Sequence, residues 1–287
     1  MLFLAVNRTE PRCKESADIE VTMELHGKVV VITGASRGIG RALSIALAKS
    51  GCRLLLTALE KDELTSISEY LTADLGASVT FMPADLINES DRRRFLDWIG
   101  TREQPPDILI NNAGAGCFGR FASCDWSDVE RMIDLDIRAP ALLTHELIPV
   151  LSTRPEAKIV IISSAVSRLP YPGLAIYGAA KGFLSSLSES LACELAGTNV
   201  SILCFHPGFT DTHFMASAAM DMRRIPKFLI RSPEAVAARI VHAIEKDTAW
   251  AYSDLGCRFG VIVAALLPSR VKTRLFRNLF WKLPHGE

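Results

Sequence analysis

Short metal-binding and disulfide motifs are absent from this sequence. The seven cysteines form no CxxC pair, and the six histidines include no HExxH. An odd number of scattered cysteines indicates reduced thiols and a cytoplasmic protein, and we expect no dedicated metal site. Lys plus Arg and Asp plus Glu number 32 each, so the formal net charge is zero and gives no reason to expect nucleic-acid binding.

Long apolar segments are also missing. The opening MLFLAV is too short for a secretory signal, and the apolar run 259–267 is too short to span a bilayer. We expect a poorly ordered arm over residues 1–22, and Met23 is either the true start or the residue that follows a genuine extension. The composition, with 49% hydrophobic and 22% charged residues, is that of an ordinary globular protein.

Strand-like and helix-like segments alternate along the chain. Runs rich in Val, Ile and Leu are typical of strands that are buried on both faces, and amphipathic segments separate them. The sequence therefore predicts an α/β protein: a Rossmann-type, doubly wound parallel sheet of about seven strands with helices on both faces, in one domain over residues 23–255. The expected strands are 29–33, 54–58, 79–83, 108–111, 159–163, 200–205 and 250–253, and the expected helices are 38–50, 60–75, 88–101, 126–152, 174–196 and 233–246.

The C-terminal segment, residues 256–287, combines apolar and basic residues. After Pro268, basic residues without an acidic one alternate with Leu, Phe and Trp at roughly helical spacing. Such a helix can lie in a membrane interface as a peripheral contact. It can equally pack on its own domain or on a partner subunit, and the sequence leaves these alternatives open. The bases are Arg270, Lys272, Arg274, Arg277 and Lys282, and the apolar residues are Leu275, Phe276, Leu279, Phe280 and Trp281.

A glycine-rich loop, TGASRGIG at residues 33–40, follows the first expected strand. Gly34 permits a sharp turn, Gly38 lets a pyrophosphate approach the backbone, and Gly40 lets the next helix lie close to the strand. Free N–H groups at that helix N-terminus would face the phosphates. The alternative is a tight turn that binds nothing. The predicted dinucleotide contacts here are Thr33, Gly34, Ser36, Arg37, Gly38, Ile39 and Gly40.

The end of the second strand bears on the choice of cofactor. An acidic residue there would hold the adenine ribose 2′-hydroxyl of NAD, but Ala58 and Leu59 stand at the tip, and Glu60 lies just beyond it. Arg37, with help from Lys61, can meet the 2′-phosphate of NADP. We therefore expect NADP(H) to be favoured over NAD(H), with Glu60 as the residue that argues the other way.

Tyr177 and Lys181 lie one turn apart on one face of an expected helix. Ser164 ends the buried strand before that helix, and the segment NNAG at 111–114 ends the strand before that one. All three groups therefore meet at the carboxyl edge of one parallel sheet, where ligands bind in such folds. Each also has a purely structural explanation: a core tyrosine, a solvated lysine and a strand-end serine cap.

Several motifs stand in one order along about residues 25–250: TGASRGIG, Asp85-Leu86, NNAG, Ser164, YGAAK and PGFTDT. In this order and combination the chain resembles the short-chain dehydrogenase/reductase family, in its compact single-domain branch. The resemblance implies an oxidoreductase that interconverts an alcohol and a ketone or aldehyde with NAD(P)(H). It also implies a homodimer or homotetramer that assembles through the helices 126–152 and 174–196.

The resemblance assigns roles to individual residues. It implies Tyr177 as the catalytic acid and base, Lys181 as the cation that lowers the Tyr177 pKa and grips the nicotinamide ribose, and Ser164 as a donor to the substrate oxygen. The implied cofactor contacts beyond the glycine loop are Asp85, Leu86, Asn111, Ala113, Gly114, Tyr177, Lys181, Pro207, Gly208, Thr210 and Thr212.

One position departs from the family pattern. The family usually has an asparagine on the long helix, holding a water that relays protons to the lysine, and in MIDLDIRAP that place falls on Asp136. A carboxylate can hold a water, but it would also pair with Lys181 and screen the pull of that lysine on Tyr177, which would raise the Tyr177 pKa. Our hypothesis is that Asp136 is a further catalytic residue, with the relay preserved and the pH profile altered.

The substrate side is expected to be apolar. The stretch after Thr212 would cover the substrate in this family, and Met-rich surfaces suit flexible pockets for apolar molecules. A lipid, steroid, retinoid or acyl-chain carbonyl would fit it, and the alternative is a lid that only packs on the core. The expected lid residues are Phe214, Met215, Met220, Met222, Ile225, Phe228, Leu229 and Ile230, and the expected walls are Cys117, Phe118, Phe121, Leu169 and Tyr171.

Two functions other than NADPH-dependent carbonyl reduction stay open from sequence. A nucleotide-sensing protein without turnover would keep the fold, but it would be expected to lose the tyrosine or the lysine, and this chain has both Tyr177 and Lys181. A membrane-associated binding protein would depend instead on the C-terminal segment.

Overall fold

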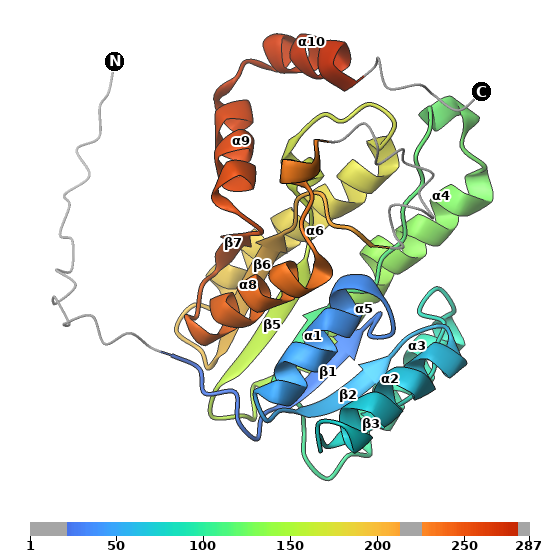
Figure 1. Cartoon of the computed structure of the whole chain (residues 1–287), viewed down its shortest axis with the longest axis vertical. Coiled ribbons are helices and arrows are strands. Elements are labelled where there is room, and N and C mark those ends of the chain that lie inside the picture. The colour runs from blue at the N-terminus through green and yellow to red at the C-terminus, as the bar shows by residue number, and fades with distance from the viewer. Residues whose placement is uncertain (1–21, 213–225, 281–287) are drawn as a thin grey trace, which may run out of the picture.

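A seven-stranded parallel sheet, in the order β3-β2-β1-β4-β5-β6-β7, organises the computed structural model, which describes residues 22–212 and 226–280 (Figure 1). Every expected strand is confirmed, with small shifts at the ends. Each is rich in β-branched or leucine side chains, which suit a sheet that is covered on both faces. The strands are β1 (Val29–Thr33), β2 (Arg53–Thr57), β3 (Val79–Phe81), β4 (Ile108–Asn111), β5 (Ala157–Ile162), β6 (Val200–His206) and β7 (Trp250–Tyr252).

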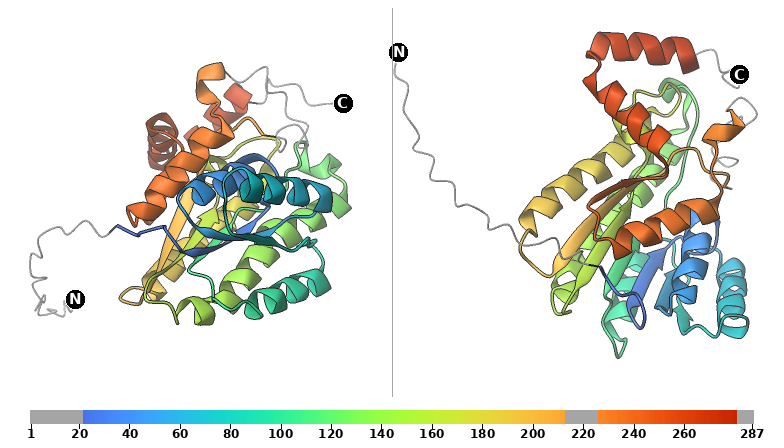
Figure 2. Two further views of the ribbon diagram at one scale, coloured as in Figure 1. Left: turned by 60° about the horizontal axis from the view of Figure 1, so that its bottom comes forward. Right: turned by 60° about the vertical axis from the view of Figure 1, so that its left-hand side comes forward.

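Helices connect the strands and cover both faces of the sheet (Figure 2). Side-chain oxygens cap several of them: Asn88 accepts from the Ser90 N–H at 2.9 Å, and Ser232 accepts from the Ala235 N–H at 3.2 Å. Such caps satisfy N–H groups that have no partner within the helix. The helices are α1 (Gly38–Lys49), α2 (Lys61–Ala73), α3 (Glu89–Gly100), α4 (Trp126–Ile133), α5 (Ala139–Leu151), α6 (Ala175–Glu194) and α8 (Pro233–Glu245).

Successive side chains of each strand enter two different apolar cores. In β1, Val30 and Ile32 pack with side chains of α1, α2 and α8, whereas Val29 and Val31 pack with side chains of α3, α5 and α6. All four are at most 3% exposed. The sheet is therefore the middle layer of three, which confirms the predicted single doubly wound domain.

The expected helix over residues 126–152 is helical from Trp126 to Leu151, but it is not a regular α-helix throughout. One turn of π-helix, Asp134–Arg138, separates α4 from α5. Pro140 has no N–H to donate to the Asp136 carbonyl, so the regular α-helical hydrogen bond is missing at this point. The Ala139 N–H donates to the Asp134 carbonyl instead, with the wider spacing of a π-helix. Within this turn the Asp136 side chain is completely buried.

The order in which the chain adds strands reverses at β1. The strands β2 and β3 are added on one side of β1, and β4 is then added on its other side. Ligands bind beyond the carboxyl ends of strands at such a switch point. Gly34 directly follows β1 and Asn112 directly follows β4, so the two motifs predicted to bind the dinucleotide start from adjacent strand ends.

The two ends of the domain differ in their packing. Of the expected N-terminal arm, residues 1–21 lie outside the described residues, while Met23 and Leu25 belong to the core and the Met23 N–H donates to the Glu245 carbonyl at 2.8 Å. The C-terminal segment forms two helices, α9 (Leu255–Leu266) and α10 (Ser269–Phe280), which extend beyond the carboxyl edge of the sheet (Figures 1 and 2). Over the described ranges, no helix has both the length and the apolar character needed to cross a membrane.

Candidate active site

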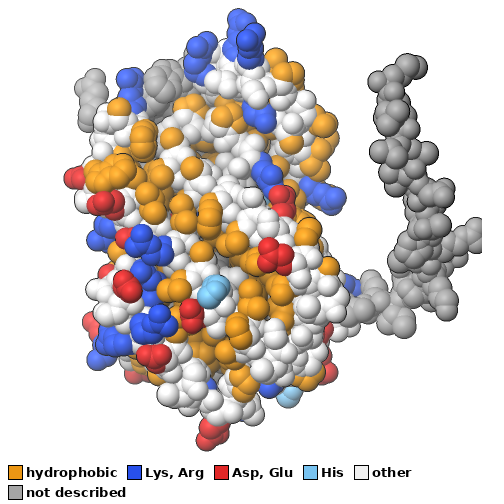
Figure 3. Space-filling model, turned by 180° about the vertical axis from the view of Figure 1, so that it is seen from behind, with side chains coloured by type: hydrophobic (Ala, Val, Ile, Leu, Met, Phe, Trp, Pro, Cys, Tyr) orange, Lys and Arg blue, Asp and Glu red, His pale blue; other side chains and the backbone are white. Residues whose placement is uncertain are grey.

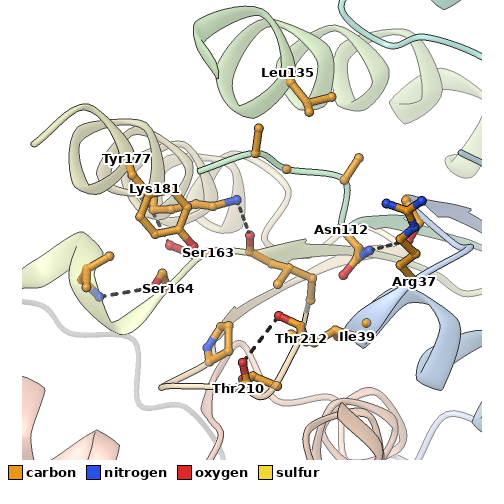
Figure 4. Close-up of a pocket in the computed structure, with 18 of the residues that line it drawn as sticks. Arg37, Ile39, Asn112, Leu135, Ser163, Ser164, Tyr177, Lys181, Thr210 and Thr212 are labelled. Atoms are coloured by element: carbon orange, nitrogen blue, oxygen red, sulfur yellow. Dashed lines mark hydrogen bonds between the residues drawn. The ribbon is translucent and has the colours of Figure 1, made fainter. Parts of the chain in front are cut away.

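A cavity of about 770 Å³ runs along the carboxyl edge of the sheet. At one end it is lined by the glycine loop, and at the other by Ser164, Tyr177 and Lys181 (Figure 4). This volume lies within the usual range for small-molecule and cofactor sites. The motifs that the sequence placed at one edge of the sheet therefore share one cavity.

The glycine loop has the backbone that its sequence predicts. Gly34 and Gly38 have φ angles of 64° and 52°, in the left-handed region that residues with a side chain rarely adopt. A Cβ at Gly40 would overlap the Gly34 carbonyl oxygen, so only glycine allows α1 to start this close to β1. Ser36, Arg37 and Ile39 line the cavity together with Gly34 and Gly38, whereas Thr33 and Gly40 shape the loop from behind.

Hydrogen bonds hold the loop to the end of β4. The Thr33 hydroxyl oxygen accepts from the backbone N–H groups of Asn112 and Ala113, both at 3.0 Å, and the Asn112 amide donates to the Thr33 carbonyl at 2.9 Å. Asn112 lines the cavity, whereas Asn111 points into the protein, where its amide donates to the Thr144 hydroxyl at 3.0 Å. Sequence reasoning chose Asn111 of the pair, but Asn112 is the one at the cavity.

Arg37 lies at the mouth of the nucleotide end and is about half exposed. It forms an ion pair and two hydrogen bonds with Glu63 of α2. The hydrogen bond and charge of Glu63, together with the charge of Glu60, raise the pKa of the Arg37 guanidinium. Glu60 also lines the cavity. Both the basic group that favours NADP and the acidic group that favours NAD are therefore present at this end.

The remaining predicted cofactor residues line the cavity on both sides of the glycine loop. The Asp85 carboxylate accepts from the Ile87 N–H at 3.0 Å, which fixes the turn after β3. From the other side, the Thr212 methyl group lies 3.1 Å from where a Cβ of Gly38 would be, so the segment after β6 approaches the glycine loop closely. The predicted contacts on these two sides are Asp85, Leu86, Ala113, Gly114, Pro207, Gly208, Thr210 and Thr212.

Ser164, Tyr177 and Lys181 come together at the other end (Figure 4). Ser164 follows β5 and caps the short helix η3 (Ala165–Arg168), its hydroxyl accepting from the Val166 N–H at 3.4 Å. Tyr177 and Lys181 extend from α6, with the Lys181 Nζ 5.6 Å from the centre of the Tyr177 ring. The Lys181 ammonium donates to the Ile162 carbonyl at 3.3 Å. The predicted catalytic trio is therefore one cluster of buried polar side chains.

Asp136 lies directly behind this cluster and does not line the cavity. Its Oδ2 is 3.0 Å from the Lys181 Nζ, and its Oδ1 accepts from the Ala115 N–H at 2.7 Å. A Cβ at Gly114 would lie 3.0 Å from Asp136 Oδ2 and 3.2 Å from Lys181 Nζ, so the pair packs against a glycine. The π-helical turn thus carries a buried carboxylate to the predicted catalytic lysine.

Burial and the charges of this cluster act in opposite directions. Burial raises the pKa of Tyr177, and although the Lys181 cation and a hydrogen bond with Ser164 lower it, Asp136 adds to the rise and the net shift is upward. Burial is the largest influence on the pKa of Lys181 and lowers it, but the attractions of Asp136, Tyr177 and Cys204 together outweigh burial, so that the net shift is upward. Burial raises the pKa of Asp136 against the attraction of Lys181. Tyr177 is therefore a protonated phenol at neutral pH.

Known proteins share this fold and sequence pattern. The family model of short chain dehydrogenases matches residues 28–223. Glycine betaine reductase ATRR of Emericella nidulans is 31% identical over 228 residues, 77% of this chain, although the match covers only 18% of that longer protein. Sulfoacetaldehyde reductase 2 of Chromohalobacter salexigens is 32% identical over 188 residues, 65% of this chain and 74% of that protein.

Among solved structures, a short-chain dehydrogenase from Sphingobium yanoikuyae in complex with NADPH is similar to this chain. The TM-score is 0.75 at 26% identity, and the match covers 85% of this chain and 99% of that one. This chain belongs to the short-chain dehydrogenase family. The dehydrogenase is accordingly an oxidoreductase that acts on an alcohol or a carbonyl compound with a nicotinamide nucleotide, as its sequence predicted.

The substrate end of the dehydrogenase has side chains that sequence reasoning only partly identified. Leu169 and Tyr171 line the cavity as expected, whereas Cys117 and Phe118 pack behind Tyr177, and Phe121 is 55% exposed and away from the cavity. Most expected lid residues, from Phe214 to Ile225, lie outside the described residues, while Phe228 and Leu229 are exposed. Lining residues that the sequence did not point to are Arg131, Leu135, Leu174, Phe209 and Phe276.

Phe276 is the least expected of these residues, because it comes from α10, in the C-terminal segment. Its side chain is only 8% exposed and lines the cavity. The C-terminal segment therefore packs on its own domain at this point, one of the alternatives that the sequence left open. The only signal in the sequence is the apolar residue itself, and nothing in its spacing indicates the partner.

Proposed function

We propose that this dehydrogenase is an NADPH-dependent reductase of apolar ketones or aldehydes. The observation that carries the proposal is the cluster of Ser164, Tyr177 and Lys181 in the same cavity as the glycine loop. Such a cavity can hold a nucleotide and a carbonyl compound together, with a proton donor at one end.

The residues present fit a nicotinamide dinucleotide. The open backbone at Gly34 and Gly38, next to the N-terminus of α1, suits the pyrophosphate. Asn112, after β4, lies between this loop and the strand end that carries Ser164, and Asp85, after β3, lines the cavity on the other side of the loop. When bound, the nicotinamide would supply the hydride for reduction. Arg37 supports the choice of NADPH, because a guanidinium pairs well with a 2′-phosphate.

The remaining chemistry is a proton transfer that the chain's own residues perform. The Ser164 hydroxyl donates a hydrogen bond to the substrate oxygen, where negative charge develops. The Tyr177 hydroxyl gives its proton to that oxygen, so that the carbonyl becomes an alcohol and Tyr177 becomes a phenolate. The Lys181 ammonium stabilises the phenolate. Because burial and Asp136 raise the pKa of Tyr177, the phenol is protonated at neutral pH and has a proton to give.

The lining of the cavity beyond Tyr177 supports an apolar substrate. Leu135, Leu174 and Phe209 enclose it together with Leu169, Tyr171 and Phe276. Each CH₂ group of a ligand that moves from water onto such a surface makes the free energy of binding more favourable by about 0.8 kcal/mol. The affinity should therefore rise with the length of an aliphatic chain.

The decisive experiment follows NADPH and NADH oxidation with a panel of aliphatic aldehydes and ketones of increasing length. We expect kcat/KM to rise with chain length, and Tyr177→Phe to lower kcat by about a thousandfold, since a positioned acid typically contributes 10²–10⁴-fold. The matched control is Tyr171→Phe, at a second tyrosine that lines the same cavity. A flat or falling series with chain length would exclude the apolar substrate. Equal losses in the two variants would exclude Tyr177 as the proton donor.

A further inference from the structure

The helix α9 is apolar except for Arg258, but it is covered on one side only. Val261 and Ala264 are buried against the domain. On another face, Leu255, Phe259, Ile262 and Leu266 follow each other at the i, i+4, i+7 and i+11 positions of a helix, and all four are exposed. Three of them are highly exposed: Leu266 by 81%, Leu255 by 75% and Phe259 by 69%. A contiguous apolar stripe of this kind on a helix is normally covered by protein or by lipid.

The next helix, α10, continues this apolar surface and adds positive charge. Phe276 faces the cavity, whereas Val271 and Leu275 are 50% and 42% exposed. Exposed arginines flank these residues, at positions 270, 274 and 277. Figure 3 shows basic side chains on α10 at the top of the molecule and hydrophobic side chains along the edge that α9 forms. We call the exposed apolar residues of α9 and α10, with Arg258, Arg270, Arg274 and Arg277, the C-terminal surface.

The charge of this surface decides what can cover it. No acidic residue is present between Asp254 and Glu287. A second copy in a twofold interface would bring the same surface against itself, so that its arginines would face like charges. A bilayer with anionic headgroups offers the complementary charge next to an apolar layer, which is the arrangement that a basic amphipathic helix requires.

We propose that the C-terminal surface docks the dehydrogenase on the surface of an anionic lipid bilayer. At about 1.5 Å per residue, the 12 residues of either helix reach about 18 Å, much less than the bilayer core of about 30 Å. The helices therefore lie in the interface, with the stripe Leu255, Phe259, Ile262 and Leu266 among the acyl chains and the arginines at the phosphates.

The position of Phe276 links this surface to the cavity. The same helix exposes Leu275 and places Phe276 in the lining of the substrate end. The bilayer would therefore lie next to the part of the cavity that Phe276 lines. This step rests on the proposed function, because it matters only if the substrate is apolar, whereas docking itself does not depend on activity.

Flotation of the full chain with vesicles tests docking without any measurement of activity. We expect the protein to float with phosphatidylcholine vesicles that contain about one-third phosphatidylserine, to bind at least tenfold less to pure phosphatidylcholine, and to be released by about 1 M salt, which screens charge beyond about 3 Å. Phe259→Ser combined with Leu266→Ser should abolish flotation, and so should the triple change Arg270→Gln, Arg274→Gln and Arg277→Gln.

The matched control is Phe121→Ser combined with Trp126→Ser, which removes two aromatic residues that are 55% and 61% exposed elsewhere on the molecule. This variant should float like the wild type. All altered residues are exposed, so the thermal unfolding temperature should be the same throughout. Failure of the full chain to float with anionic vesicles would overturn the proposal. So would a change from oligomer to monomer, in light scattering, that only the Phe259–Leu266 variant shows, because the occupant would then be a second copy.

Discussion

The two ends of the cavity are built in different ways. The nucleotide end consists of backbone and short side chains: a glycine loop with two left-handed residues, held by Thr33 and Asn112. The apolar part of the substrate end consists of large side chains that distant segments contribute, from Leu135 in the π-helical turn to Phe276 in α10. The nucleotide end requires particular residue types at particular positions. The apolar part of the substrate end requires only side chains that are apolar.

Because of this difference, the two ends should tolerate amino-acid substitutions to different degrees. A substitution at the nucleotide end moves the backbone, and the backbone itself would contact the phosphates. A substitution at the substrate end changes the volume and shape of a surface that other apolar side chains can partly refill. We therefore expect the largest losses at the nucleotide end, and selective, graded losses at the substrate end.

The substitution Gly40→Ala should cause the largest loss of nucleotide binding. The new methyl group would overlap the Gly34 carbonyl, so α1 and the loop must separate. A hydrogen bond to a charged group is worth about 1.5–3 kcal/mol, so the loss of backbone contacts to the phosphates should raise the Kd for NADPH on the order of 100-fold. Gly100→Ala is the control, because a Cβ there meets nothing within 4 Å. Equilibrium binding by nucleotide fluorescence measures both, and an unchanged Kd in Gly40→Ala would contradict the assigned role of the loop.

A second, smaller effect should distinguish the two nucleotides. Arg37→Ala removes the guanidinium that pairs with Glu63 in this structure and that we propose binds a 2′-phosphate. A charge-assisted hydrogen bond is worth about 1.5–3 kcal/mol. We expect kcat/KM for NADPH to fall about 20-fold while that for NADH stays within twofold. The same measurement on Lys61→Ala tests whether Lys61 also contributes to binding of the 2′-phosphate. If Arg37→Ala lowers both values equally, Arg37 supports the fold of the loop and does not select NADPH.

The sequence predicted the nucleotide end almost completely, because its physical constraints are local. Gly34, Gly38 and Gly40 are required by one turn of backbone, and the strand before them is recognisable from its apolar residues. The one ambiguity was within Asn111-Asn112, where neighbouring residues of a strand point to opposite sides. Which of the two reaches the cavity depends on the exact end of β4, and residue types alone do not determine that.

The rest of the site could not be predicted because it depends on long-range packing. Phe276 is almost a hundred residues from Tyr177 in sequence, and no local pattern links an apolar residue of α10 to this cavity. The π-helical turn had a local signal in Pro140, but a proline can also simply begin a helix. The position of Asp136 next to Lys181 was inferred from the family resemblance, and the structure places the two side chains in contact.

Truncation of a wall should affect the substrate end alone. Phe276→Ala removes a ring that is 8% exposed, and full burial of such a side chain is worth about 1.5–3 kcal/mol. We expect KM for a long-chain aldehyde to rise about tenfold, with the Kd for NADPH unchanged. Leu275→Ala, at an exposed neighbour on the same helix, should change neither value in an assay without lipid. Steady-state kinetics with a short and a long aldehyde provide the comparison, and equal effects on both would show that α10 contributes only to stability.

The smallest expected effect is a shift in the pH profile when Asp136, which lies behind the cavity, is substituted. In the proposed mechanism, alcohol oxidation requires the Tyr177 phenolate, so the rate of oxidation should rise with pH through the pKa of Tyr177. Asp136 raises this pKa, and Asp136→Asn should therefore move the midpoint of the rate profile to lower pH, by about one unit. Asp134→Asn, in the same π-helical turn, alters an ion pair with Arg138 and should leave the midpoint in place.

A midpoint that moves upward in Asp136→Asn would mean that the carboxylate acts mainly by keeping Lys181 charged, because a neutral lysine no longer favours the phenolate. No shift at all would mean that the buried carboxylate 3.0 Å from Lys181 has no influence on proton transfer, and that the pair only stabilises the fold.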